Sequence, residues 1–154
     1  RLAQRAIEGA LSFPKVEVLV RQHRIEEALE LLDQIIEMTG GEPDYFAMRG
    51  WILFQRYKGA DAPFETMLTC VDRALKMDNG HEKAHFTKAM ILKRMGLDQE
   101  ALKHFKTVSE INPKNVDAVR EVRLASMRRR KDSGATAKSE NQGGGLFGGL
   151  FKKK

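Results

Sequence analysis

The sequence predicts an all-α fold in which helical hairpins stack into an α-solenoid. Hydrophobic residues recur at helical spacing, Gly and Pro residues mark the ends of these segments, and similar segments recur after roughly 34 residues. The step from Ala74 to Val108 equals this period. With 154 residues the chain is long enough for one hydrophobic core. We therefore expect about three hairpins and a C-terminal capping helix over residues 1–131.

The first hairpin is expected to contain helices over residues 2–22 and 25–37. Pro14 lies inside the first of these and lacks a backbone donor, so we expect the helix to kink or restart there. The second helix has apolar residues at helical spacing and stops at Gly40-Gly41, a pair typical of a helix C-terminus.

The second hairpin is expected to begin at Pro43, because proline is favoured in the first turn of a helix. Its first helix extends to about Tyr57, and residues 55–63 form an enlarged turn. The next helix begins at Pro63 or Phe64 and ends near Met77. This helix carries Cys70, the one cysteine of the chain, which we expect to be a small core residue.

The third hairpin is expected over residues 81–95 and 99–111, and Asn112-Pro113 ends it. A further helix over residues 115–130 places Val116, Val119 and Val122 along one side, with charged residues around the rest. A solenoid needs such a helix at its end, because the last hairpin would otherwise expose its apolar side.

Small residues recur where the helices of successive hairpins would cross, as at Ala28 and Ala101. A period of roughly 34 residues with this feature is typical of tetratricopeptide repeats. Residues 5–130 resemble C-terminal tetratricopeptide regions of bacterial multidomain proteins, some of which also carry a J domain. The resemblance rests on the second-repeat motif, the enlarged turn and the basic tail; the motif residues are Phe46, Gly50, Trp51, Leu53 and Phe54.

The resemblance implies a non-enzymatic scaffold that binds a partner peptide or amphipathic helix in a concave groove, within a larger bacterial assembly. The first helix of each hairpin would line this groove. Trp51 would be the natural hot spot, although Trp51 and Phe54 would instead be ordinary core if the helix phase differed by one residue. The predicted groove residues are Phe13, Val20, Met48, Trp51, Phe54, Phe86, Met90, Lys93 and Arg94, with Glu17 and Ala47 beside them.

The resemblance also provides a test for one known class of ligand. Tetratricopeptide domains that clamp the acidic C-terminus of eukaryotic chaperones carry Lys, Asn and Arg at particular first-helix positions. Only Lys83 fits that pattern here, so a carboxylate clamp is not expected; the matching positions hold Phe13, Glu17, Met48, Lys83 and Thr87.

The net charge of +6 does not belong to the repeats. Acidic and basic residues balance over residues 1–127, so the excess lies in residues 128–154. Basic residues 128–131 fall at the end of a predicted helix, where the macrodipole favours cations. We therefore interpret these residues as a solvated helix end and not as a nucleic-acid site. Binding to nucleic acid would weaken steeply as salt increases and would be lost on removal of residues 128–154.

Residues 132–145 are polar and rich in glycine, so we expect a flexible linker. Residues 146–154 follow as a tail with two Leu-Phe pairs, Leu146-Phe147 and Leu150-Phe151, and three terminal lysines. The tail suits three alternatives: docking into the groove of its own or a neighbouring chain, which would make a homo-oligomer; weak contact with an anionic membrane; or no function.

Residues 81–85 match the zinc-hydrolase pattern in which His81 and His85 bind the metal and Glu82 activates water. The segment begins a repeat helix, and the continuation typical of metzincins fails, since Lys88 and Ile91 replace the Gly and the third His. A zinc hydrolase is therefore the competing class to the scaffold. We predict no catalytic residue, no metal and no cofactor.

The sequence shows no apolar run of membrane-spanning length and no signal-peptide pattern. One cysteine cannot form a disulfide framework, so a reducing, cytoplasmic location is expected. The chain begins at Arg1 without a methionine, which suggests a piece of a longer protein.

Overall fold

The computed structural model describes the backbone of residues 1–148 and the side chains of residues 1–134. Over this part the chain forms seven α-helices and no strand, which confirms the predicted all-α solenoid. None of these helices is both long enough and apolar enough to span a membrane. The helices are α1 (Leu2–Arg21), α2 (Ile25–Thr39), α3 (Pro43–Arg56), α4 (Phe64–Met77), α5 (Glu82–Arg94), α6 (Asp98–Ile111) and α7 (Val116–Gly148).

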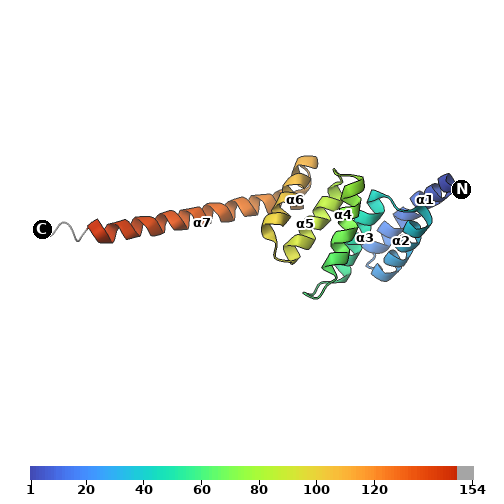
Figure 1. The fold of residues 1–154 in the computed structure, drawn as a ribbon, viewed down its shortest axis with the longest axis horizontal. Helices are drawn as coiled ribbons and strands as arrows, with labels where there is room; N and C mark the ends of the chain where they lie inside the picture. The colour runs from blue at the N-terminus through green and yellow to red at the C-terminus, as the bar shows by residue number, and fades with distance from the viewer. Residues whose placement is uncertain (149–154) are drawn as a thin grey trace.

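Consecutive helices pair into three hairpins, α1 with α2, α3 with α4 and α5 with α6. Figure 1 shows the six helices stacked side by side, with α7 leaving the stack as a long single helix. The α3 helix also contacts α5, so the first helices of neighbouring hairpins adjoin. The enlarged turn predicted in the second hairpin is confirmed, since residues 57–63 separate α3 from α4.

Local chemistry explains where the helices end. Gly40 follows α2 with a φ of 84°, in the left-handed region that glycine adopts without strain. Asn115 begins α7, since its side-chain oxygen accepts a hydrogen bond from the backbone N–H of Ala118 at 3.1 Å. The α1 helix does not restart at Pro14: it continues to Arg21 and lacks only the donor that proline cannot supply.

The core consists of small and branched side chains at the helix crossings. Ala28, Ala74 and Ala101 are almost completely buried, as the repeat pattern predicts. Cys70 is buried in α4, which confirms its prediction as a core residue. Gly50 of α3 allows α4 to approach closely, because a Cβ atom there would lie 2.7 Å from Cγ1 of Val71.

The last helix differs most from expectation. The α7 helix begins near the predicted position but runs to Gly148, through residues 132–145, where a flexible linker was expected. Residues 135–142 include Ala, Lys, Glu and Gln, which have high helix propensity even when solvated. The division into repeat domain, linker and tail stays a prediction. Leu150 and Phe151 lie outside the described residues, as do the side chains of Leu146 and Phe147.

Candidate functional site: the face of the first helices

The surface formed by α1, α3 and α5, called here the first-helix face, is held together by aromatic contacts between hairpins. The Phe13 ring of α1 lies 4.9 Å from the Tyr45 ring of α3, centroid to centroid. Trp51 of α3 lies 6.1 Å from Phe86 of α5 and stacks on Phe54 at 5.6 Å. Such pairs add about 0.5–1.5 kcal/mol each beyond the burial of their area.

A cavity of about 360 Å³ opens on the first-helix face, between all three of its helices. The predicted groove residues Val20, Met48 and Trp51 line it, and Trp51 is only partly buried, so its indole is accessible from the cavity. The remaining lining residues are Glu17, Arg21, His23, Gln55 and Lys83.

The other predicted groove residues lie outside this cavity. Phe86 lines a separate cavity, beside α7. Phe54 is 6% exposed and packs in the core, and Met90 packs between two core clusters. Phe13 packs against the first core cluster. The structure therefore places Val20, Met48 and Trp51 in one cavity, whereas Phe54 and Phe86 contact the Trp51 ring from outside that cavity.

The two predicted basic groove residues both contact other parts of the chain. Arg94 lies 3.5 Å from the centre of the Phe54 ring and donates to the carbonyl oxygens of Phe54 and Tyr57 at 2.8 and 2.7 Å. Burial lowers the pKa of Arg94. Lys93 forms an ion pair with Glu121 of α7 at 2.6 Å. These cations thus connect α5 to its neighbouring helices.

Lys83 lines the cavity although the predicted groove did not include it. Its ammonium group lies 3.7 Å from the sulfur of Met48. Burial lowers the pKa of Lys83, and the carboxylates of Glu17 and Asp44 act in the opposite direction. Its position one turn before Phe86 on the same helix was the signal that could have placed it on this face.

The His-Glu-Lys-Ala-His segment at the start of α5 is used for contacts between helices. The Nδ1 atom of His81 accepts a hydrogen bond from the backbone N–H of Ala84 at 3.1 Å and caps α5. Its Nε2 atom therefore carries the proton and donates to Asp44 at 2.6 Å. Neither nitrogen of His81 then offers a lone pair to a metal.

Glu82 and His85 have separate partners. The Glu82 carboxylate accepts from the side-chain amides of Asn112 and Asn115 at 3.0 and 3.1 Å. His85 donates through Nε2 to the carbonyl oxygen of Asn79 at 2.7 Å, and its Nδ1 atom faces His104. Among the residues whose side chains are described, no three His, Cys, Asp or Glu converge as metal ligands. These contacts disfavour the zinc-hydrolase alternative.

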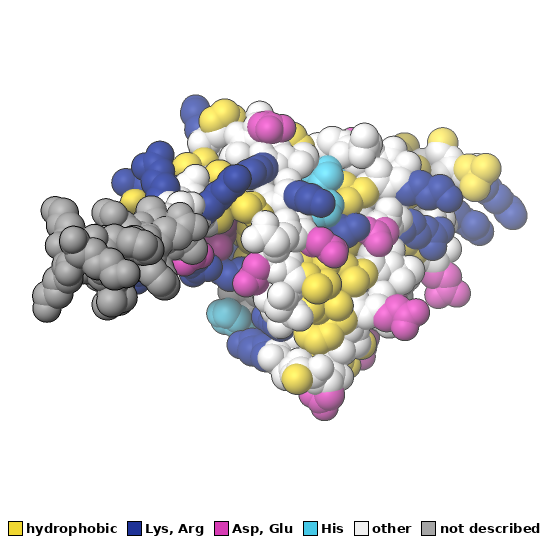
Figure 2. Space-filling model, turned by 60° about the vertical axis from the view of Figure 1, so that its left-hand side comes forward, with side chains coloured by type: hydrophobic (Ala, Val, Ile, Leu, Met, Phe, Trp, Pro, Cys, Tyr) yellow, Lys and Arg dark blue, Asp and Glu magenta, His cyan; other side chains and the backbone are white. Residues whose placement is uncertain are grey.

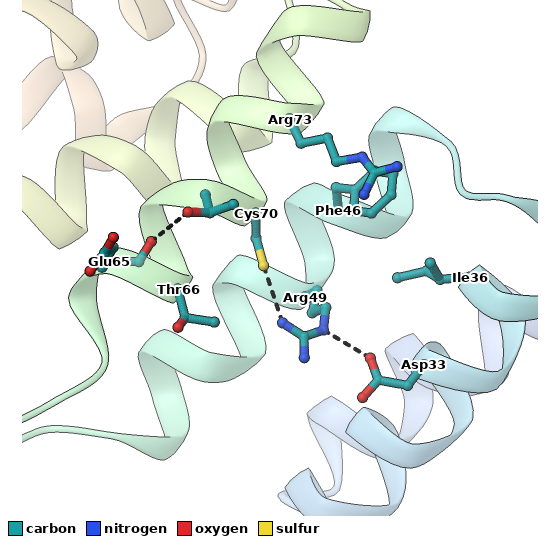
Figure 3. Close-up of a pocket in the computed structure, with 9 residues that line it drawn as sticks. Asp33, Ile36, Phe46, Arg49, Glu65, Thr66, Cys70 and Arg73 are labelled. Atoms are coloured by element: carbon teal, nitrogen blue, oxygen red, sulfur yellow. Dashed lines mark hydrogen bonds and ion pairs between the residues drawn. The ribbon is translucent and has the colours of Figure 1, made fainter.

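A second cavity, of about 410 Å³, lies between α2, α3 and α4 (Figure 3). Arg49 spans it, donating to Asp33 at 2.8 Å and to the Cys70 sulfur at 3.2 Å. Burial lowers the pKa of Arg49, but the hydrogen bonds to Asp33 and Cys70 outweigh burial and raise it. Arg73 covers the Phe46 ring at 4.3 Å. Of these contacts, the one between Arg49 and Asp33 joins the second hairpin to the first, and the other two lie within the second hairpin.

Apolar side chains also reach the outer surface of the molecule. Figure 2 shows a strip of hydrophobic side chains down the middle of one face, with acidic side chains on both sides and Lys, Arg and His above. Apolar area bordered by charge is the usual composition of a protein-binding surface.

Comparisons with known proteins bear on the fold. No family model matches the chain. Its structure is similar to the first TPR of Spaghetti (RPAP3) bound to the HSP90 peptide SRMEEVD, with a TM-score of 0.68 and 18% identity over 79% of this chain and 95% of that one. The Arabidopsis OM64 TPR domain gives a TM-score of 0.68 and 14% identity over 78% of this chain and 95% of that one. A third similar structure is YrrB, a TPR protein with an unusual peptide-binding site. It gives a TM-score of 0.59 and 21% identity over 79% of this chain and 60% of that one.

Proposed function

We propose that this chain, which has the tetratricopeptide-repeat fold, is a non-enzymatic scaffold that binds a peptide or an amphipathic helix on its first-helix face. The observation that carries the proposal is the cavity of about 360 Å³ between α1, α3 and α5, lined by a partly exposed Trp51. Similar TPR structures hold chaperone peptides, namely SRMEEVD of HSP90 and SGPTIEEVD of HSP70. A protein partner therefore suits the fold.

Trp51 is the side chain that we expect to contribute most to binding. It is anchored by ring contacts with Phe54 and Phe86, so a partner contacting it need not order it first. Tryptophan is enriched among hot spots because a rigid indole buries a large area at a low entropic cost. An apolar side chain of the partner would fill the cavity beside it.

The partner is not expected to be an acidic EEVD-type peptide. Thr87 and Met48 are buried and Glu17 carries a negative charge on the same face, so these clamp positions do not present cations or amides. Lys83 remains, but Glu17 and Asp44 already act on its ammonium group. The expectation therefore rests on the clamp positions, which lack the amides and cations that would hold a terminal carboxylate, and not on the net charge of the cavity, where Arg21 and Lys83 lie beside Glu17.

Two alternatives to a partner-binding scaffold remain as hypotheses. Self-association through Leu146-Phe147 or Leu150-Phe151 would place one chain's tail in the same cavity. A zinc hydrolase at His81, Glu82 and His85 would require these three side chains to leave the contacts described above. The cytoplasmic location and bacterial origin also stay predictions.

The experiment is affinity capture from native lysate with four baits and one control bait. These are the whole chain, a chain ending at Lys131, Trp51→Ala/Phe86→Ala, and Gln55→Trp, which fills the cavity without removing core contacts. Gln34→Trp, an exposed position on α2, is the matched control for the last bait. Circular dichroism verifies that each bait is folded.

A protein captured by the whole chain, the truncated chain and Gln34→Trp, but not by the other two, would support the proposal. Capture by every bait would contradict the first-helix face as the binding surface. Loss on truncation alone would assign binding to residues 132–154. Titration of a synthetic SRMEEVD peptide should show no saturable binding, whereas tight binding would contradict the argument from the clamp positions.

A further inference from the structure

The α7 helix has two sides with different environments. On one side Ala118 is completely buried in the core cluster of the third hairpin, and Val122 packs against the same cluster. The opposite side faces away from α6, at the end of the stack where a further helix of a solenoid would pack (Figure 1). We call this opposite side, between Val116 and Lys131, the outer α7 face.

The outer α7 face carries four exposed apolar side chains. At about 3.6 residues per turn, Val116, Val119, Leu124 and Met127 all lie within the half of the helix opposite Ala118. They are 68%, 40%, 39% and 51% exposed, respectively. Covering the third hairpin does not require four large apolar side chains on the opposite side of α7.

Basic side chains are interleaved with these apolar residues on the same half of the helix. By the same helical spacing, Arg120, Arg123, Arg130 and Lys131 share the outer α7 face, and each is exposed. Of the two acidic residues of this stretch, Glu121 lies on the Ala118 side of the helix, and Asp117 lies at the edge of the outer α7 face, as far from Ala118 around the helix as Val119. Asp117 contacts Arg120 at 3.4 Å, and Glu121 contacts Lys93 of α5 at 2.6 Å. The face is therefore apolar with a net positive charge, and its one carboxylate, Asp117, is paired with Arg120.

We propose that the outer α7 face binds an acidic amphipathic helix of a partner protein, which packs on α7 as the next helix of the stack. Charge complementarity carries the choice of occupant. A helix with apolar residues along one stripe and Glu or Asp beside them would cover the four apolar side chains and place carboxylates next to Arg120, Arg123 and Arg130. This surface is separate from the first-helix face, so the two proposals stand independently.

Two other anionic partners match the surface less well. A helix that lies on a membrane separates an apolar face from an opposite polar face, whereas here basic and apolar side chains share one face. A nucleic acid would engage the arginines through its phosphates, but it would leave Val116, Leu124 and Met127 without apolar partners. Neither alternative uses both components of the surface.

The test titrates the whole chain with a fluorescently labelled synthetic helix that repeats Leu at two positions of each heptad and Glu beside them. A peptide of the same composition in scrambled order is the probe control. The variants are Arg123→Glu/Arg130→Glu and Val116→Gln/Met127→Gln, all at exposed positions. The matched control is Lys76→Glu/Lys103→Glu, which changes the charge equally on α4 and α6.

We expect saturable binding of the amphipathic peptide, weakened about tenfold or more by either α7 variant and little changed by the control. Equal binding of the scrambled peptide, or equal binding by all variants, would overturn the proposal. The proposal would also be overturned if the chain failed to bind the peptide but bound vesicles of phosphatidylcholine and phosphatidylserine, or duplex DNA, in a way that depended on α7. Self-association that depends on Val116 and Met127, measured by sedimentation, would replace the partner helix with a second copy.

Discussion

The imidazole rings of His85 and His104 face each other across α5 and α6, with their Nδ1 atoms 3.0 Å apart. Because His85 already donates through Nε2 to the carbonyl oxygen of Asn79, its neutral Nδ1 atom is the acceptor in this pair and His104 donates. The contact requires Nδ1 of His85 to stay unprotonated, since a proton there would place two N–H groups in opposition.

Stability should therefore fall on mild acidification. Burial lowers the pKa of His104, the charges of Lys88 and of His85 lower it further, and Asp72 and Glu100 oppose them. Since the folded pKa lies below the unfolded value near 6.5, the unfolded chain binds more protons between the two values, and the free energy of unfolding decreases as pH falls below about 6.5. Urea titrations at several pH values measure this slope.

The control for the pH experiment is a change at an exposed histidine. His104→Gln should flatten the dependence below about pH 6.5. The comparison variant is His23→Asn, because Asn tolerates the positive φ of 58° at that position. An unchanged slope in His104→Gln would show that the pair does not control acid sensitivity.

Gly50→Ala should destabilise the second hairpin. The added Cβ would lie 2.7 Å from Cγ1 of Val71 and 3.5 Å from the Met67 carbonyl oxygen, so α3 and α4 must separate. We expect a loss of about 1–3 kcal/mol in the free energy of unfolding, as for other overpacked sites. Thermal and urea denaturation measure it.

Two further variants test the cause. Gly80→Ala meets only a contact at 3.8 Å and should be nearly neutral. Removing the opposing methyl groups with Val71→Ala should make the double variant with Gly50→Ala less destabilised than the sum of the two single changes. Additive losses would argue against the steric explanation.

Arg94→Met should cost stability although the side chain is only partly buried. It removes both donors to the Phe54 and Tyr57 carbonyl groups, which close the C-terminal end of α3. We expect a loss of about 1–2 kcal/mol, since charged donors contribute more than neutral ones. Lys93→Met, which breaks only the exposed pair with Glu121, should lose less than about 1 kcal/mol. Equal losses would contradict the assignment.

Thr87→Val should stabilise the protein. The Thr87 side chain is completely buried in α5, and its hydroxyl oxygen has no hydrogen-bond partner among the described residues. Valine has the same shape without the desolvated hydroxyl, so we expect a gain of about 1 kcal/mol. Thr107→Val, whose hydroxyl bonds to the Lys103 carbonyl, should gain nothing. Denaturation midpoints of the two variants compare them directly.

The course of the helices up to residue 116 was predictable from the sequence because local signals fix it. Gly40, Pro43 and Asn112 act within one or two residues of a helix end, and their effect does not depend on distant packing. The burial of Cys70 followed from its position on an apolar helix side. The continuation of α7 beyond Lys131 did not follow, because composition alone favoured a linker there.

The candidate site was predictable only in part, because it depends on pairings between residues far apart in sequence. Val20, Met48 and Trp51 were placed by helical phase. The partners of Arg94 lie about 40 positions earlier in the sequence. No local pattern indicates that its guanidinium group donates to carbonyl oxygens of α3 and is therefore not free to bind a partner. The motif at His81 and His85 left a zinc site only as an alternative, and it gave no sign of the neighbours that these histidines have, Asp44 and His104.

Helix contacts that join only neighbouring hairpins have a consequence for how the chain acquires its structure. Each of the α1–α2, α3–α4 and α5–α6 pairs closes over a short stretch of sequence, and no strand pairing must wait for a distant segment in the described residues. Chains of this kind fold rapidly and can order hairpin by hairpin. During synthesis the α1–α2 pair can therefore acquire its internal packing before the residues of α7 have been translated.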